Sequence, residues 1–294
     1  MTPTISTLGI ATLVAASPLV LATLGAVLTY RAGLLDIGLE GKIAVGTFTA
    51  LAWAAWVPNA PERWWAPLVA IGMAVVGSVA ISLVHAGVVL VGKADAFISA
   101  IGINLVGLAL VPLGLQAVFG SPGSSPGTAR IVLPHLHEAL GSLTWIDGAG
   151  AIGALVLATW LAHHRGGAHL HAVGVAPDAA AQSGIRPARW HLIALLGSGL
   201  AAGLAASQLT VGSLGIVSPM MVAGRGFLAL AAAVVARGNV WPAMLACVVM
   251  GFGEALADYL VTVTHAPQFL LALPWLLALV GLTVAAWLRV RRRA

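Results

Sequence analysis

The chain has 294 residues, of which 60% are apolar and only 8% are Asp, Glu, Lys or Arg, and its mean hydropathy is +1.01. Ordinary soluble domains carry roughly 25% charged residues, so this composition cannot cover a globule in water. We therefore interpret the net charge of +5 as a membrane-topology signal, and we expect no nucleic-acid partner. The single cysteine, Cys247, excludes an intrachain disulfide.

Charge-free stretches divide the chain into segments that can be compared with the roughly 20 helical residues needed to cross a bilayer. The stretches that are long enough are residues 5–30, 65–91, 97–119, 192–211 and 269–288. Residues 43–57 and 146–162 are short, residues 242–263 span only if they tolerate two carboxylates, and residues 227–236 resemble half of a broken helix. We predict an all-α, polytopic membrane protein with about nine transmembrane helices, some short or broken, forming one domain over residues 1–294.

Basic residues predict the orientation because they favour the inner side of a membrane. With the C-terminus inside and the spans alternating, eleven of the 14 Lys and Arg lie inside, including Arg31, Lys42 and the four arginines at positions 289 and 291–293. Only Arg63, Arg130 and Arg225 then lie outside. This orientation predicts an external N-terminus, an external loop at 120–144, an internal loop from about 163 to 191 and a cytoplasmic C-terminus.

Two stretches rich in glycine interrupt the apolar pattern, residues 31–42 near the start of the chain and residues 211–226 in its second half. Paired interruptions of this kind mark the central pathway in transporters built from internal repeats, because unwound backbone at membrane depth must line a cavity or be buried in protein. The pairing is typical of an internal repeat. The alternative is that both stretches are ordinary loops at the membrane surface.

The internal loop contains a predicted short helix. Pro177 can begin it, Asp178 suits its positive N-terminal end, the following alanines extend it and Gly184 ends it. Such a helix has too little apolar surface to fold alone, so we expect it to dock on another protein.

Here the sequence resembles a known family. Asp178-Ala179-Ala180 followed by Gly184 is similar to the Glu-Ala-Ala-x-x-x-Gly loop of bacterial ABC importer permeases, with Asp in place of Glu. Residues 172–185, 36–41, 94–105 and 223–230 resemble the branched-chain amino acid, ribose and nucleoside permease superfamily, in order from about residue 25 to 288. Residues 36–41 and 223–227 look most like its nucleoside and simple-sugar subgroup. The Ile-x-Leu-Pro that trails the loop in many importer permeases is absent.

The resemblance implies a permease subunit of an ATP-driven importer, in the bacterial inner membrane, that moves a nucleoside or simple sugar. It implies no enzyme activity and no cofactor, because ATP would be hydrolysed by a cytosolic ABC ATPase. The other implied partners are a second, different permease chain and an extracytoplasmic solute-binding protein. It makes the loop at 163–191 the coupling loop, with the ATPase-coupling residues Pro177, Asp178, Ala179, Ala180, Gln182, Ser183, Gly184, Ile185 and Arg186.

Polar residues of the spans give two competing hypotheses. An aqueous path for an uncharged solute needs neutral hydrogen-bonding groups, and our candidates are Asn104, Gln208, Ser213 and Ser218. For any one of them, hydrogen bonding between helices is the alternative. Glu254 and Asp258 share one helix face and would instead suit an ion-coupled secondary transporter, unless they lie at the outer mouth or at a subunit interface.

Three further patterns carry little chemistry. Residues 87–93 satisfy G-x-x-x-x-G-K, but Ala94 stands where a Mg²⁺-binding Ser or Thr is needed. The histidines at 163, 164, 169 and 171 have no accompanying cysteine, so we expect no metal site. His191 and Ser198 are roughly 10 Å apart along one helix, too far for the proton transfer that a serine hydrolase needs.

Overall fold

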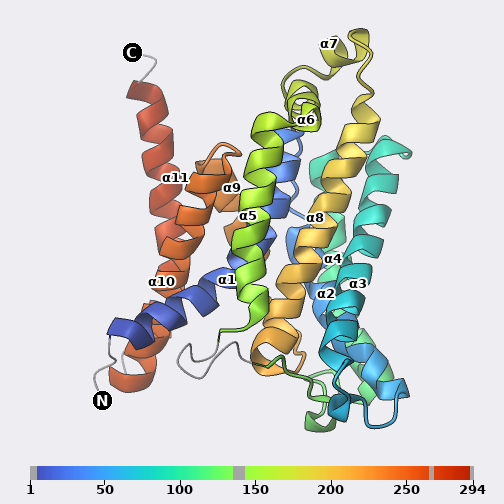
Figure 1. Cartoon of the computed structure of the whole chain (residues 1–294), viewed down its shortest axis with the longest axis vertical. Coiled ribbons are helices and arrows are strands. Elements are labelled where there is room, and N and C mark those ends of the chain that lie inside the picture. Colours follow the sequence, from blue (N-terminus) through green and yellow to red (C-terminus); the bar gives the residue numbers. More distant parts are fainter. Residues whose placement is uncertain (1–4, 135–142, 265–267, 292–294) are drawn as a thin grey trace.

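A computed structural model of the chain describes residues 5–134, 143–264 and 268–291, and their regular secondary structure is helical. The all-α prediction is therefore confirmed. The long helices run alongside one another between two ends of a bundle (Figure 1). In chain order the α-helices are α1 (Ile5–Arg31), α2 (Leu39–Ala52), α3 (Ala66–Leu90), α4 (Ala96–Phe119), α5 (Trp145–His163), α6 (Arg165–Val175), α7 (Pro177–Gln182), α8 (Pro187–Leu209), α9 (Arg225–Val235), α10 (Val240–Thr264) and α11 (Leu273–Arg291).

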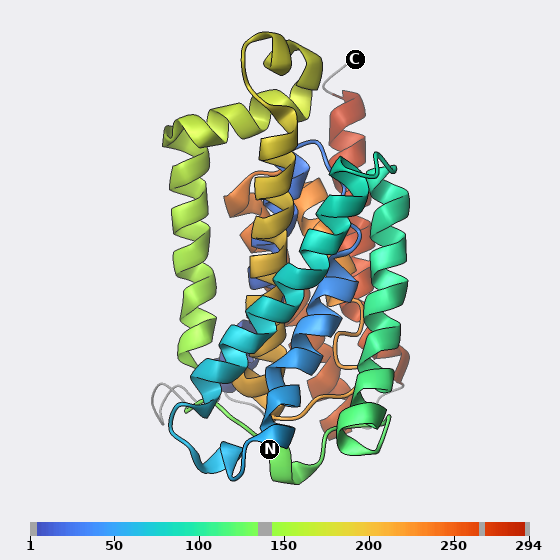
Figure 2. The same ribbon diagram turned by 90° about the vertical axis from the view of Figure 1, so that its right-hand side faces the viewer.

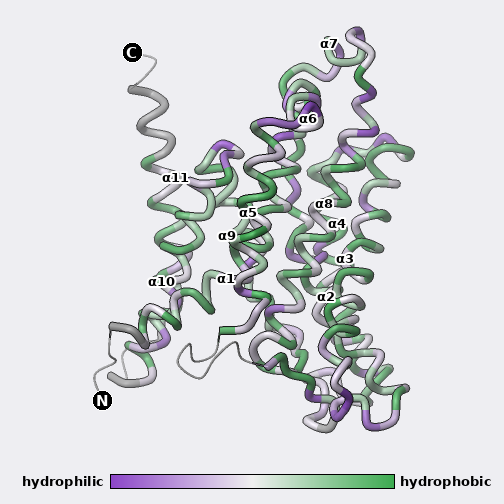
Figure 3. The backbone as a smooth tube through the Cα atoms, in the orientation of Figure 1, coloured by the Kyte–Doolittle hydropathy of each residue, from purple (hydrophilic) through white to green (hydrophobic). Residues whose placement is uncertain are grey.

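Six helices of the described residues are long and apolar enough to cross a membrane, namely α1, α3, α4, α5, α10 and α8 with its π-helical extension η5 (Thr210–Leu214). Helix α2 has 14 residues and continues into the 3-10 turn η1 (Trp53–Trp56), whereas α9 has only 11 residues. Hydrophobic residues predominate along the long helices, and hydrophilic residues gather around α6, α7 and the connections at the other end (Figure 3). The chain is a multi-pass membrane protein, and the number nine stays a prediction.

Helix α8 lies at the centre of the bundle and packs against α1, α2 and α3. Together with α1 it is the most buried of the six spans, and α5 is the most exposed. Helices in lipid associate through close packing, which favours small residues at their interfaces. Between α2 and α4, a methyl group on Gly107 would lie 2.6 Å from Gly41 Cα, so the two backbones touch there.

Helix α10 packs along α1 on another side of the bundle. There the side chain of Cys247 is completely buried, and its Sγ lies 3.1 Å from Thr23 Oγ1 of α1. The lone thiol therefore joins two helices.

The two ends of the bundle differ. Helix α6 lies across one end and α7 extends furthest beyond it, and we call this the α7 end (Figures 1 and 2). Helix α1 starts at the opposite end, whereas α11 finishes at the α7 end (Figure 1). The loop that carries α7 and the last helix thus lie at the same end of the bundle.

Candidate functional site

The first interrupted segment, between α1 and α2, enters the bundle and carries a buried ion pair. The side chains of Asp36 and Lys42 are both 0% exposed, and Lys42 Nζ donates to Asp36 Oδ2 at 2.6 Å. Ser198 Oγ of α8 donates to the same oxygen. Lys42 is therefore no surface charge, and counting it among the residues that orient the chain was wrong because Asp36 neutralises it inside the protein.

His85 of α3 completes this cluster. Its Nδ1 lies 3.7 Å from Asp36 Oδ1, an oxygen that accepts no hydrogen bond from any residue that the structure describes. The cluster thus joins the interrupted segment to α2, α3 and α8. Ser198 is bound directly to a carboxylate and is fully buried, which leaves no room for a role as an accessible nucleophile.

Asn104 of α4 holds the same segment from its other side. Its Oδ1 accepts from the backbone N–H of Gly41, and its Nδ2 donates to the carbonyl of Ile37, both at 2.8 Å. The side chain is 5% exposed. Hydrogen bonding between structural elements, the alternative to a pathway role, is what this geometry favours for Asn104.

The two interrupted segments meet at Glu40. One carboxylate oxygen accepts from the N–H of Gly224 at 2.6 Å, and the other accepts from the N–H of Gly226 at 2.8 Å. These groups form the N-terminus of α9, where a negative charge is favourable. Val211 and Val222 of the second segment are about 99–100% buried in the main hydrophobic cluster, so this segment is not a loop on the membrane surface.

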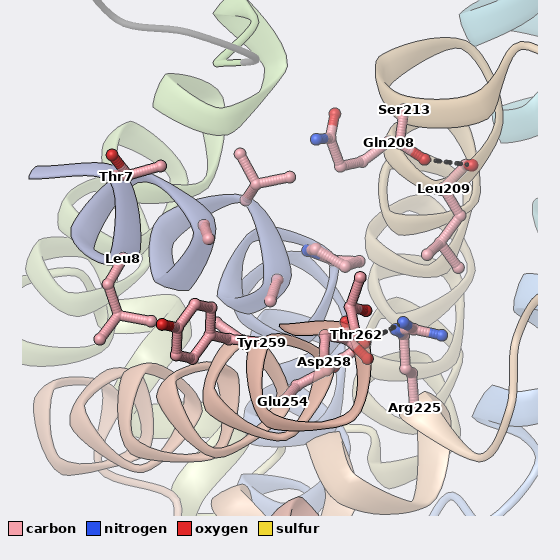
Figure 4. A pocket seen from close by; sticks show the side chains of 15 residues that line it. Thr7, Leu8, Gln208, Leu209, Ser213, Arg225, Glu254, Asp258, Tyr259 and Thr262 are labelled. Atoms are coloured by element: carbon pink, nitrogen blue, oxygen red, sulfur yellow. Dashed lines mark hydrogen bonds and ion pairs between the residues drawn. The ribbon is translucent and has the colours of Figure 1, made fainter. Parts of the chain in front are cut away.

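A cavity of about 520 Å³ lies between α1, η5, α9 and α10 (Figure 4). Two of the four predicted pathway residues line it, Gln208 and Ser213, while Asn104 and Ser218 do not. The complete lining is Thr7, Leu8, Ala11, Val14, Ala15, Pro18, Gln208, Leu209, Ser213, Arg225, Glu254, Ala255, Asp258, Tyr259 and Thr262.

An ion pair lies on one wall of this cavity. Arg225 Nη2 bonds to Glu254 Oε1, and Arg225 Nη1 also donates to the carbonyls of Met221 and Val222 (Figure 4). Arg225 was expected to lie outside the membrane, but it begins α9 inside the bundle, where Glu254 neutralises it. Asp258, one turn further along α10, is exposed.

The neutral polar groups of the cavity are held in place. Gln208 Nε2 donates to Asp147 Oδ1 at 2.7 Å, and Asp147 caps the start of α5 through Thr144. Ser213 Oγ donates to the carbonyl of Leu209 at 2.9 Å. Opposite them, α1 supplies an aliphatic wall of leucine, valine and alanine. The arrangement suits a small solute that has both hydrogen-bonding groups and an apolar face.

The predicted short helix exists as α7, and it begins at Pro177 as expected. Gly184 has φ +80°, and the backbone N–H groups of Gly184 and Ile185 donate to the carbonyls of Ala181 and Ala180. This is a Schellman motif, a helix end that favours glycine at the left-handed position. Within α7 only Ala180 is buried, so the bundle covers almost none of its surface.

Helix α6 connects α7 to the buried ion pair. A methyl group on Gly174, near the end of α6, would lie 2.9 Å from the backbone nitrogen of Gly33. The backbones of α6 and of the segment after α1 are therefore in direct contact at this point. Gly33 is three residues from Asp36, the carboxylate that binds both Lys42 and Ser198.

The histidines of this region have structural contacts. His164 Nδ1 accepts from the N–H of Gly166 at the start of α6, and His169 packs edge-on against Trp190. In the part of the chain that the structure describes, no three His, Cys, Asp or Glu side chains come together as metal ligands.

Comparison with known proteins now decides the family. The family model described as the branched-chain amino acid transport system / permease component matches residues 9–287. The chain belongs to this family.

Three curated relatives of this permease are each 28% identical to it. The guanosine ABC transporter permease protein NupQ of Bacillus subtilis aligns over 93% of this chain and 90% of its own length. The nucleoside ABC transporter permease protein NupC of Lactococcus lactis aligns over 83% and 80%, and the putative glucose ABC transporter permease protein TsgC13 of Haloferax volcanii over 84% and 75%.

Family membership makes the permease a transport component rather than an enzyme. It also implies an ATPase and a substrate-binding partner. The ion-coupled alternative based on Glu254 and Asp258 is not favoured by these relatives, and in the structure Glu254 is already paired with Arg225.

Three contacts of charged side chains were not predicted from the sequence: the Asp36–Lys42 pair, the contact of Glu40 with α9 and the Arg225–Glu254 pair. Charges inside otherwise apolar stretches were the available signal. The partners of Glu40 lie 184 and 186 residues away in the sequence, and the partner of Arg225 lies 29 residues away. The sequence therefore identified these charged residues as unusual but could not predict which groups they contact.

Proposed function

We propose that this permease moves a nucleoside or a simple sugar across the bacterial cell membrane as one subunit of an ATP-driven ABC importer. The observation that carries the proposal is the family match over residues 9–287, supported by relatives named for guanosine, nucleosides and glucose. The cavity beside Gln208 and Ser213 supports it further, because it offers neutral hydrogen-bonding groups, and because its only cation, Arg225, is neutralised by Glu254 among the described residues.

Solute passes, in this proposal, along the cavity between α1, α9 and α10. Gln208 and Ser213 are the pathway residues that the geometry favours, with Asn104 and Ser218 acting through packing. Charged groups at membrane depth are costly in contact with lipid, so the exposed carboxylate of Asp258 favours an aqueous path or another protein on that face.

A second permease chain is the proposed neighbour on that face, and the nucleoside and simple-sugar subgroup that the sequence resembles uses two different permease chains. The partner chain would close the open side of the cavity. An extracytoplasmic binding protein delivers the solute at the end of the bundle opposite α7.

Energy enters through the coupling loop. The exposed residues of α7 and its turn, from Pro177 to Arg186, dock on a cytosolic ATPase, which places the α7 end and the C-terminus in the cytoplasm. Closure of the ATPase moves α6, and the Gly174–Gly33 contact passes this movement to Asp36 and Lys42. ATP hydrolysis can change the conformation of the solute path only if α7 binds the open and closed states of the ATPase with different affinity.

The test is uptake by sealed vesicles that contain the permease with its ATPase, second permease and binding protein. We expect labelled guanosine or glucose to accumulate only with ATP, and proton and sodium ionophores to leave uptake unchanged. Accumulation driven by an ion gradient in vesicles containing this chain alone would overturn the proposal.

Asp258→Asn separates the importer from an ion-coupled transporter. It removes a carboxylate while leaving the Arg225–Glu254 pair intact. ATP-driven uptake should survive within about twofold, since Asn keeps the size and hydrogen-bonding capacity of this lining residue and removes only the charge that ion coupling would need. Its collapse in this variant would favour the ion-coupled mechanism.

A further inference from the structure

A second cavity, of about 370 Å³, lies at the α7 end of the bundle, away from the solute cavity. Its lining comes from the end of α1, the segment after it, the second half of α6 and the turn after α9. The residues are Tyr30, Arg31, Gly33, Leu34, Leu35, His171, Gly174, Val175 and Arg237.

The polar side of this cavity is basic. Arg31, His171 and Arg237 line it, and no carboxylate does. Among the residues that the structure describes, neither arginine forms an ion pair. Guanidinium groups bind phosphate and carboxylate through paired hydrogen bonds, so the chemistry of this lining suits an anion.

The turn after α9 carries Arg237 and also contacts Arg31, the last residue of α1. Helix α9 ends in a Schellman motif in which Arg237 and Gly238 donate to the carbonyls of Val234 and Ala233. Arg31 Nε donates to the carbonyl of Gly238 at 2.7 Å. The guanidinium of Arg31 is therefore fixed beside the residue that carries the second guanidinium.

Arg237 occupies a position where glycine is expected. Its φ is +54°, in the left-handed region, at the same place in the motif where α7 has Gly184. A side chain in this conformation costs roughly 1 kcal/mol or more, and such strain persists where the side chain has a task. The strained position thus holds an exposed arginine beside the guanidinium of Arg31.

The other side of the cavity is apolar and open. Leu35 is 47% exposed and Val175 is 71% exposed, and both lie beside the basic groups. Tyr30 and Arg31 are the last residues of the α1 span, so the cavity lies at the depth where the hydrocarbon gives way to lipid headgroups. An ATPase held by α7 would contact the permease beyond this level.

We propose that this basic cavity binds the phosphate headgroup of an anionic phospholipid, with the acyl chain against Leu35 and Val175. The headgroup phosphate takes hydrogen bonds from Arg31, Arg237 and His171. Anionic lipids are known to occupy basic pockets between membrane helices. The site is separate from the solute cavity, so its occupancy does not depend on which solute is transported.

The experiment measures phosphatidylglycerol retained by the full-length permease with its partners, released from mixed phosphatidylglycerol and phosphatidylcholine nanodiscs and analysed by native mass spectrometry. Arg237→Gln should weaken retention about fivefold, the effect of one basic residue near a membrane surface. Adding His171→Gln should weaken it further. Arg189→Gln is the matched control, because Arg189 is exposed at the same end but does not line the cavity.

The variant Arg237→Gly separates a loss of lipid binding from a loss of stability. Glycine relieves the backbone strain, so this variant should unfold at a higher temperature than the wild type while losing the lipid. Retention unchanged in both Arg237 variants would overturn the proposal. Competition by inorganic phosphate as strong as by phosphatidylglycerol would assign a free anion instead, and loss of the ATPase with lipid retention unchanged would assign a protein contact instead.

Discussion

The ion pair of Asp36 and Lys42 has an energetic consequence that follows from its burial. Two charges removed from water contribute little net stability, but removing one of them leaves the other uncompensated. Lys42 also accepts a hydrogen bond at its carbonyl from Ser78 of α3, so its position is fixed from two sides. The pair is therefore a constraint on how α2, α3 and α8 are arranged.

We predict that Asp36→Asn lowers the free energy of unfolding by about 3–5 kcal/mol, because Lys42 remains as an unpaired buried cation. The double variant Asp36→Asn with Lys42→Met should recover most of this loss. Thermal unfolding of the purified permease in mild detergent measures both effects.

Ser198→Ala is the control for this prediction. It removes one hydrogen bond to Asp36 but leaves the ion pair, so it should cost only about 1 kcal/mol. Equal stability of Asp36→Asn and Ser198→Ala would contradict the assignment of a charged pair.

Among the helices, α7 could be predicted from the sequence because both of its ends are determined locally. Pro177 suits the first turn, and Gly184 supplies the left-handed residue after the last one. The clustering of Gln208 with Arg225 and Glu254 could not be predicted, since it depends on how η5, α9 and α10 pack. For the same reason, nothing in the local sequence distinguished Gln208 and Ser213 from Asn104 and Ser218.

We expect Gly184→Pro to reduce ATP-driven uptake by about 5–150-fold, the usual range of a lost coupling between two sites. Proline cannot adopt φ +80° and has no N–H to donate to Ala181, so the end of α7 is lost. Membrane insertion should be unaffected because α7 lies outside the bundle. Gly184→Ala, which keeps the N–H, should retain most of the uptake, and wild-type uptake by Gly184→Pro would remove the coupling role from this loop.

The contact between α6 and the first interrupted segment gives a different prediction. Gly174→Val would force the backbone of Gly33 away, while α7 itself stays intact. The ATPase should therefore still co-purify and hydrolyse ATP, but solute uptake should fall. Gly102→Val on α4, where a side chain meets nothing within 4 Å, is the control. Normal uptake in Gly174→Val would show that force reaches the pathway by another route.

At the scale of the whole molecule, the first and last helices indicate how the chain is oriented. Helix α1 starts at the end opposite α7 and α11 finishes at the α7 end, so assigning a side to α7 assigns both (Figure 1). The sequence led to the same arrangement, although it included Lys42 and Arg225 among the surface charges. Without these two residues, the excess of basic residues on the predicted cytoplasmic side comes from residues such as Arg31, Arg186 and Arg237 at the α7 end.

We predict that Asp178→Cys reacts with an impermeant maleimide only from the cytoplasmic side, and that Gly123→Cys reacts only from the outside. Both positions are exposed, at opposite ends of the bundle. Intact cells and inverted vesicles provide the two measurements. Labelling of position 178 in intact cells would reverse the orientation and remove α7 from reach of a cytosolic ATPase.

The thiol held between α1 and α10 makes such mapping simple. Since Cys247 is completely buried, thiol reagents should not reach it, and the natural chain should show no labelling of its own. Every adduct on a variant would report the introduced residue alone. A single-cysteine library covering both faces of the permease can thus be built without first replacing the native residue and disturbing its neighbour Thr23.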